Sequence, residues 1–125
     1  MLYDTDVVIW VFRGNAKAAR LIDQEADRSL SVISFMELLQ GAADKTETRL
    51  IKNFLKECAI EVLPLTENIG HRASIYMEEF SLSSGLRVAD ALIAATAAEN
   101  HLPFCTGDYR HFRALRDLEL SIFRP

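Results

Sequence analysis

Short apolar runs alternate with segments of helical periodicity along the whole chain. The runs read MLY, LSVI, IEVL, PFC and LSIF, and they occupy residues 1–3, 30–33, 60–63, 103–105 and 120–123. Each run is rich in strand-favouring residues and has the length of a strand. Strands that alternate with helices form parallel sheets whose faces the helices cover. The pattern therefore predicts an α/β sandwich around a mostly parallel central sheet.

Three of the intervening segments have the character of amphipathic helices. Residues 15–27 are rich in helix formers. Residues 46–59 carry an apolar stripe at helical spacing, and the next segment carries another. We expect both stripes to pack in the core; their members are Leu50, Ile51, Phe54, Leu55, Cys58 and Ala59 in the first and Ile69, Ala73, Tyr76 and Phe80 in the second.

Two further segments lack a clear polar face. Residues 88–99, VADALIAATAAE, are apolar on nearly all sides, which predicts a buried central helix. Residues 6–12, DVVIWVF, are ambiguous, because their β-branched side chains favour a strand while Asp6 at the head permits a helix start. Periodicity alone leaves both interpretations open.

The composition is that of one globular domain. The chain has 125 residues, 50% of them hydrophobic and 26% charged, which predicts a single domain over residues 1–125. It has no basic leader with a cleavage site and no apolar stretch near the roughly 18 residues that span a bilayer. We therefore expect a cytoplasmic protein with no membrane partner. Cys58 and Cys105 are isolated in the sequence, which favours buried free thiols over a disulfide or a zinc site.

Four acidic residues stand where α/β proteins usually carry their chemistry. They are Asp4 at the end of the first strand, Glu37 at the start of the helix after the second strand, Asp90 near the front of the buried helix, and Asp108 after PFCTG. In open α/β sheets, ligands collect outside the carboxyl ends of the strands, where helix N-termini also point. We therefore expect the four carboxylates to converge.

Each of these acids also has a purely structural interpretation. Ser34 and Glu37 have the spacing of a capping box, and Asp108 could cap a helix. Asp90 lies among apolar residues, where an unpaired carboxylate is costly, and the basic residue at helical spacing is Arg87 at the edge of the segment. A divalent cation shared by the acids would neutralise all of them together.

Ligation by carboxylate oxygens, without His or Cys, favours Mg²⁺ or Mn²⁺ over zinc. Such an ion lowers the pKa of a bound water and stabilises charge on the leaving oxygen of a phosphodiester. The four acids therefore predict metal-dependent phosphodiester hydrolysis.

The net charge of −4 at first argues against a nucleic-acid partner. If four of the 18 acids hold metal, the other 14 balance the 14 Lys and Arg residues (18 − 4 = 14). Basic side chains near the C-terminus are then available for phosphate, and a solvated helix face is the alternative for each. These candidates for RNA contact are Arg110, His111 and Arg113, with Arg116 and Arg124 nearby.

Several of these stretches together resemble a known family. LYDTDVVIW, SVISFMELLQGA, VADALIAATAAENHLPFCTGDYRHF and the terminal LSIF resemble PIN-domain proteins of the VapC type, the toxins of type II toxin–antitoxin pairs. The resemblance covers essentially the entire chain. It implies a PIN-like α/β/α sandwich in which residues 6–12 form a helix, and a metal-dependent endoribonuclease that hydrolyses RNA.

The resemblance also implies roles for individual residues and partners. The catalytic metal ligands would be Asp4, Glu37, Asp90 and Asp108. The groups that support these ligands would be Asp6, Ser34 and Thr106. The resemblance further implies a homodimer and a small VapB-like antitoxin whose C-terminal segment blocks the acidic site.

Two other functions compete with this one. In a haloacid-dehalogenase-like phosphatase Asp4 would be the nucleophile, with Ser34, Asp108 and either Lys52 or Lys56 in later roles. That order places both lysines inside an amphipathic helix and leaves Glu37 and Asp90 without a role. The second alternative is a PIN-like module that binds RNA without cleaving it, for which four retained carboxylates serve no purpose.

Overall fold

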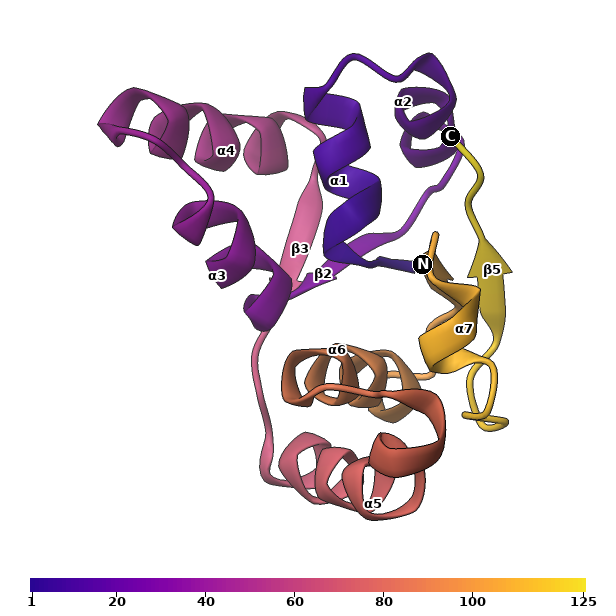
Figure 1. The fold of residues 1–125 in the computed structure, drawn as a ribbon. Helices are drawn as coiled ribbons and strands as arrows, with labels where there is room; N and C mark the ends of the chain where they lie inside the picture. The colour runs from indigo at the N-terminus through magenta and orange to yellow at the C-terminus, as the bar shows by residue number, and fades with distance from the viewer.

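The computed structural model describes residues 1–125 and contains a sheet of five strands (Figure 1). The strands are β1 (Leu2–Tyr3), β2 (Arg28–Ser31), β3 (Ile60–Leu63), β4 (Phe104–Thr106) and β5 (Leu120–Ile122), arranged in the order β3-β2-β1-β4-β5. Every neighbouring pair is parallel. The predicted α/β class with a parallel sheet is confirmed.

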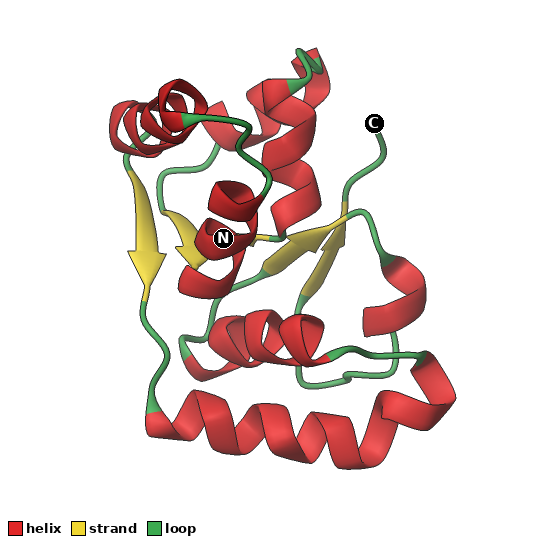
Figure 2. Ribbon diagram, turned by 60° about the vertical axis from the view of Figure 1, so that its left-hand side comes forward, coloured by secondary structure: helices red, strands yellow, loops and turns green.

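Seven helices connect or follow the strands and cover both faces of the sheet. They are α1 (Thr5–Phe12), α2 (Ala16–Asp23), α3 (Val32–Gln40), α4 (Lys45–Glu57), α5 (Glu67–Ser84), α6 (Val88–Glu99) and α7 (Tyr109–Phe112). Helices α1, α2 and α4 lie on one side of the sheet and α5 and α6 on the other (Figures 1 and 2). The result is a three-layered α/β/α sandwich.

The core is divided in two because successive side chains of a strand point to opposite faces. Leu2 and Phe104 pack against residues of α5 and α6. Their neighbours Tyr3 and Cys105 pack against residues of α1, α2 and α4. The short strands β1 and β4, of two and three residues, therefore contact both layers of helices at once. They form the centre of the sheet beneath the acidic residues.

Residues 6–12 fold as a helix, as the family resemblance implies. Asp4 is the N-cap of α1 and accepts a hydrogen bond from the Thr5 amide at 2.8 Å. Val7 and Val8 are fully buried against the sheet. The capping carboxylate and this burial outweigh the strand preference of the β-branched side chains.

Helix α6 is the buried central helix that its sequence predicts. Six of its residues are buried, from Ala91 to Ala97 with Leu92 excepted, and the helix lies between the sheet and α5. Small alanine side chains permit this close approach on several sides. The front of α6 is thereby held in a fixed position, and it carries Asp90.

Several predicted boundaries are wrong by two to four residues. The second strand ends at Ser31, and Val32 and Ile33 begin α3, because the Ser31 hydroxyl caps that helix by accepting from the Ile33 amide at 3.1 Å. Helix α2 spans 16–23 within the predicted 15–27. Helix α4 ends before Ala59, whose φ of 51° lies in the left-handed region.

The two apolar stripes are confirmed except at two positions. In α4, Ile51 and Leu55 are buried, whereas Leu50 is 60% exposed, and Ala59 beyond the helix is exposed as well. In α5, Ile69, Ala73 and Tyr76 are buried. The exposure of Leu50 shows that this edge of α4 faces a surface and not the core.

Both cysteines are free thiols, in agreement with the sequence. Cys105 is buried, and burial raises its pKa to about 12. Cys58 is only partly buried. No helix of the protein is both long and apolar enough to cross a membrane.

Candidate active site

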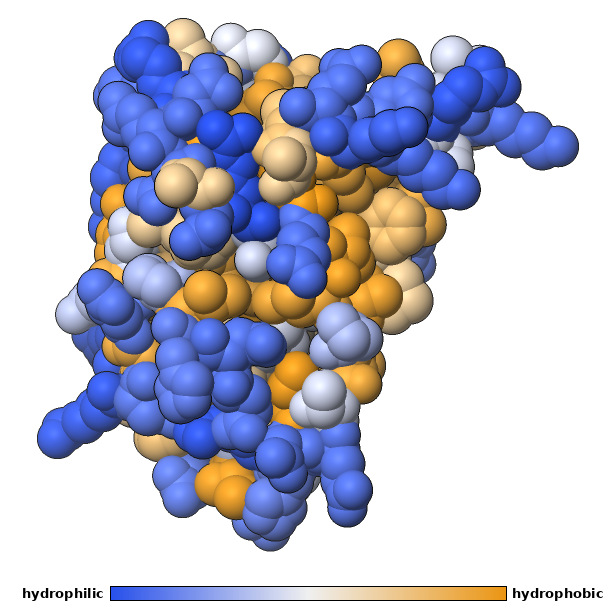
Figure 3. Space-filling view, turned by 180° about the vertical axis from the view of Figure 1, so that it is seen from behind, coloured by the Kyte–Doolittle hydropathy of each residue, from blue (hydrophilic) through white to orange (hydrophobic).

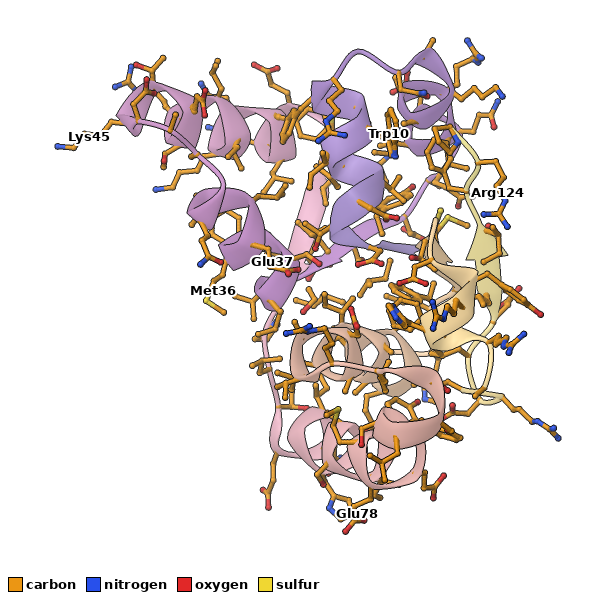
Figure 4. All side chains as sticks on the ribbon, in the orientation of Figure 1. Trp10, Met36, Glu37, Lys45, Glu78 and Arg124 are labelled. Atoms are coloured by element: carbon orange, nitrogen blue, oxygen red, sulfur yellow. The ribbon has the colours of Figure 1, made fainter.

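The predicted acids occupy the carboxyl edge of the sheet, at the ends of β1 and β4 and on two neighbouring helices. Asp4 follows β1 and caps α1, and Asp108 follows β4 and caps α7. Asp90 is the third residue of α6, and Glu37 the sixth of α3. Glu37 therefore does not begin its helix, which corrects its expected position. Figure 4 shows it directed from α3 toward the start of α1.

Asp4 lies at the centre of the hydrogen-bond network. Its side chain is bonded through both oxygens, since Oδ1 accepts from the Thr5 amide at 2.8 Å and Oδ2 accepts from the Thr106 hydroxyl at 2.6 Å. The Thr106 hydroxyl in turn accepts from the Asp108 amide at 3.0 Å. Thr106, expected to support the ligands, thus connects the first acid with the last.

Asp6 lies beside the turn that follows β4. Its Oδ2 accepts from the Gly107 amide at 3.0 Å, while its Oδ1 is buried without a hydrogen-bond partner. A Cβ on residue 107 would approach Asp6 Oδ2 to 2.7 Å, which is too close for any residue but glycine unless the carboxylate moves. Gly107 is therefore a residue of the site that its sequence position alone does not identify.

Glu37 is linked to the same network through Thr5. The Thr5 hydroxyl donates to Glu37 Oε1 at 2.7 Å, and Thr5 directly follows Asp4. Thr5 is not among the site residues that the sequence predicted, although a hydroxyl between two acids at a helix start is a usable signal. Thr5 connects α1 with α3 and brings Glu37 to the edge where Asp4 lies.

The capping-box interpretation of Ser34 and Glu37 is wrong. Ser31 is the cap, so Ser34 lies inside α3, where it is fully buried and its hydroxyl has no hydrogen-bond partner. Asp90 performs a capping role instead, because its Oδ2 accepts from the Arg87 amide at 3.2 Å. The partner of Asp90 is thus the backbone of Arg87 and not its guanidinium.

We expect Ser34→Ala to leave the melting temperature unchanged or slightly higher, because the substitution removes a buried hydroxyl that makes no bond. Ser31→Ala is the matched control and should cost about 0.5–2 kcal/mol, as loss of an N-cap does. Thermal or urea unfolding followed by circular dichroism measures both. A clear loss of stability in Ser34→Ala alone would show that Ser34 has a partner in solution.

Asp108 is paired with His111, one turn along α7. Its Oδ1 accepts from the His111 amide at 3.1 Å, and its Oδ2 lies 2.5 Å from His111 Nδ1. The other side of the ring faces Gly85, where a Cβ would lie 3.5 Å from Nε2. The N-cap interpretation of Asp108 is therefore confirmed, and His111 is directed at the acidic cluster. Arg110 and Arg113, the other candidates for RNA contact, are exposed.

Burial and mutual repulsion raise the pKa values of three site acids. Burial, followed by the charge of Asp6, raises the pKa of Asp4 to about 7. The pKa of Asp6 is raised by burial and by Asp108. That of Asp90 is raised by burial first, and then by Asp108 and Glu37. The five carboxylates are thus close enough to disfavour one another's ionised forms.

The chemistry of the cluster suits a hard divalent cation. All its acidic donors are oxygens, and Asp6 retains a buried oxygen that no protein group satisfies. No three His, Cys, Asp or Glu side chains, as they are oriented, could hold a metal ion. In this arrangement oxygens of Asp4, Glu37, Asp90 and Asp108 accept hydrogen bonds from protein donors.

Comparison with known proteins agrees with this architecture. The model of the PIN domain family matches residues 1–118. Ribonuclease VapC1 of Methanocaldococcus jannaschii is 27% identical over 124 residues, which cover 98% of this chain and 86% of that protein.

Solved structures share the fold at low sequence identity. A toxin–antitoxin complex from Klebsiella pneumoniae matches with a TM-score of 0.80 and 23% identity, over 94% of this chain and 93% of the other. VapBC-1 from nontypeable Haemophilus influenzae matches with a TM-score of 0.80 and 20% identity, over 98% of both chains. The family match spans all four acids and the whole acidic edge of the sheet, and the chain belongs to the PIN domain family.

Proposed function

We propose that this protein is a metal-dependent endoribonuclease that hydrolyses RNA phosphodiester bonds, and that it is the toxin of a VapBC-type toxin–antitoxin pair. The observation that carries the proposal is the network joining Asp4, Thr106 and Asp108 at the carboxyl edge of the sheet, with Glu37 and Asp90 beside it. Membership of the PIN domain family and the likeness to Ribonuclease VapC1 support it. Its site of action would be the cytoplasm.

The metal in this proposal is Mg²⁺ or Mn²⁺, held by Asp4, Glu37, Asp90 and Asp108. When bound, such an ion activates water and stabilises negative charge on the phosphodiester. The chain's own contribution is to orient the ligands. Thr106 and Thr5 fix the carboxylates of Asp4 and Glu37 through their hydroxyls. Asp6 accepts a hydrogen bond from the Gly107 amide and would support the ligands through this contact with the turn before Asp108, without binding the metal directly.

Basic side chains beside the site would bind the RNA backbone. Arg110 and Arg113 are exposed on and directly after α7, so both guanidinium groups are available to phosphates. His111 is half-buried and is paired with Asp108. Its role would be to hold the carboxylate of Asp108 in place, with contact to RNA limited to the exposed part of the ring.

The purified chain should cleave single-stranded RNA in the presence of Mn²⁺ or Mg²⁺ and lose this activity in EDTA. Gel analysis of a labelled oligoribonucleotide measures cleavage, and restoration by added metal controls for damage by the chelator. Cleavage that persists in EDTA would contradict the mechanism. Binding of RNA without cleavage at any metal concentration would favour the non-catalytic module.

The phosphatase alternative is not favoured. Lys52 and Lys56, its candidate basic residues, are exposed on α4, and neither forms an ion pair with a site acid. The match to the PIN domain family covers the segments that the phosphatase interpretation leaves without a role.

An apolar groove supports the proposal of an antitoxin partner. The groove measures about 520 Å³, lies between α1, α3 and α4, and includes Glu37 in its lining. Phe12 on α1 and Leu50 on α4 both line it and are 45% and 60% exposed. An amphipathic antitoxin segment bound there would cover both side chains and reach the acidic site. Co-purification of the chain with a small antitoxin tests this, and an antitoxin that leaves RNA cleavage unaffected would contradict it.

We also propose a homodimer. Figure 3 shows apolar side chains gathered on the back of the molecule below α4, and exposed apolar side chains elsewhere include Met36 and Val88, at 49% and 63%. Such surface is more typical of an interface than of a free face. Sedimentation equilibrium measures the mass directly, and a monomer at micromolar concentration would contradict the proposal.

A further inference from the structure

A second groove lies on the opposite side of the protein from the apolar one. It measures about 900 Å³ and runs between α5 and the segment formed by α7 and residues 113–117. We call it the α5–α7 groove. Its apolar side chains include Ile75, Phe80 and Leu115. None of the proposed metal ligands lines it, so it is distinct from the acidic cluster.

The groove begins directly beside the acidic cluster. Tyr109, which lines it, is the residue after Asp108 and is 50% exposed. Asp108 caps α7 and Tyr109 is the first residue of that helix, so the two residues are adjacent along the backbone. A half-exposed aromatic side chain thus lies one residue from a proposed metal ligand.

Basic side chains continue the same wall beyond Tyr109. Arg113 and Arg116 line the groove, are exposed, and form no ion pair. They follow Tyr109 along one edge of the groove. Their guanidinium groups are available to an anionic ligand.

Two of the three acids that line the groove share one arginine as their ion-pair partner. Arg72 forms ion pairs with Glu99 and, at 2.5 Å, with Asp117. The Tyr76 hydroxyl donates a further bond to Asp117 at 2.7 Å. Glu79 is the one remaining lining acid, against the two unpaired arginines. The three arginines and the three acids that line the groove balance in charge, but the two arginines without an ion pair follow α7, whereas the acid without one, Glu79, lies on α5.

We propose that the α5–α7 groove binds a nucleotide of single-stranded RNA that flanks the cleaved bond, with its base stacked on Tyr109 and its phosphates contacted by Arg113 and Arg116. The inference rests on the proposed ribonuclease function and specifies its substrate. Proteins that recognise single-stranded RNA combine an exposed aromatic ring with cations along the backbone. In a duplex the bases are stacked on one another and cannot reach the ring, so the substrate is unpaired at this nucleotide.

The test uses the full chain carrying Asp4→Asn, which prevents cleavage, and a fluorescein-labelled single-stranded oligoribonucleotide in Mg²⁺. Tyr109→Ala should weaken binding roughly 10-fold, as loss of one stacked base does, and Tyr109→Phe should restore most of it. Arg113→Gln and Arg116→Gln should each lower the salt dependence of binding by about one phosphate contact. Arg49→Gln, an exposed arginine on α4, is the matched control and should change neither quantity.

The outcomes separate this inference from the proposed function. If the unmodified chain cleaves RNA but the Tyr109→Ala variant binds RNA as tightly as the chain that retains Tyr109, the groove proposal fails and the nuclease proposal stands. If the unmodified chain never cleaves RNA but the groove variants still weaken binding, the nuclease fails and the groove stands. A variant that shifts the oligomeric mass and leaves RNA binding intact would assign the groove to a second copy and overturn the proposal. Should Tyr109→Ala not fold, the salt dependence of the arginine variants decides.

Discussion

Asp4→Asn is expected to lower metal-dependent RNA cleavage at least ~100-fold, as loss of a direct ligand of a catalytic ion does, and to raise the melting temperature of the metal-free protein. Asp4 is 8% exposed and lies close to Asp6 and Asp90, and its ionised form is disfavoured. Asn retains an oxygen that can accept from Thr5 but carries no charge. Activity and stability should therefore change in opposite directions, which a merely structural residue would not produce.

Asp90→Asn should show a similar loss of activity, because Asp90 is a proposed metal ligand of the same cluster. Burial and the charges of Asp108 and Glu37 raise the pKa of its carboxyl group. Asp44→Asn is the matched control: Asp44 caps α4 as Asp4 caps α1, with the Glu47 amide at 2.9 Å, but lies outside the acidic network. Cleavage rates under single-turnover conditions and unfolding in EDTA measure the two effects. Near-normal turnover in either site variant would remove that residue from the metal site.

The metal-free protein should lose stability as the pH rises from about 4 to about 7. The folded-state pKa of Asp4, about 7, lies above its ordinary value of 3.8, so the folded state binds more protons than the unfolded state between these values. Stability is therefore greatest below the ordinary pKa and falls as the pH rises through the folded one, by up to about 4 kcal/mol for a shift of this size. The raised pKa values of Asp6 and Asp90 act in the same direction.

Urea unfolding in EDTA across this pH range measures the slope. Asp4→Asn should flatten it, since the group that titrates is gone. Millimolar Mn²⁺ added at pH 7.5 should restore stability to the wild-type chain, because a cation that binds only the folded state stabilises it and neutralises the repelling carboxylates. A metal-free protein whose stability is constant or rises over this range would show that Asp4 ionises at its ordinary pKa.

The sequence by itself determined the architecture of this protein and the chemical nature of its site. Five apolar runs alternating with helical segments are enough to predict a parallel α/β sheet, because period and length are local properties of the chain. Three of the four acids could be placed at its carboxyl edge for the same reason, since Asp4 and Asp108 follow strands and Asp90 lies in the first turn of a helix. Glu37 was expected at the start of its helix but is the sixth residue of α3. The all-round apolar character of residues 88–99 likewise required burial before any neighbour was known.

Only the tertiary structure decided which of several locally equivalent interpretations applies. Ser31 and Ser34 are both acceptable caps by sequence, and the choice depends on where the pairing of β2 with its neighbours ends. The β-branched run 6–12 became a helix because its burial against the sheet outweighs local preference. Leu50 fits a core stripe, yet the packing of α4 leaves it at a groove. The bond from Thr106 to Asp4 spans 102 residues. Contacts of that range carry no periodic signal, so the network that joins the acids exists only once the strands are side by side.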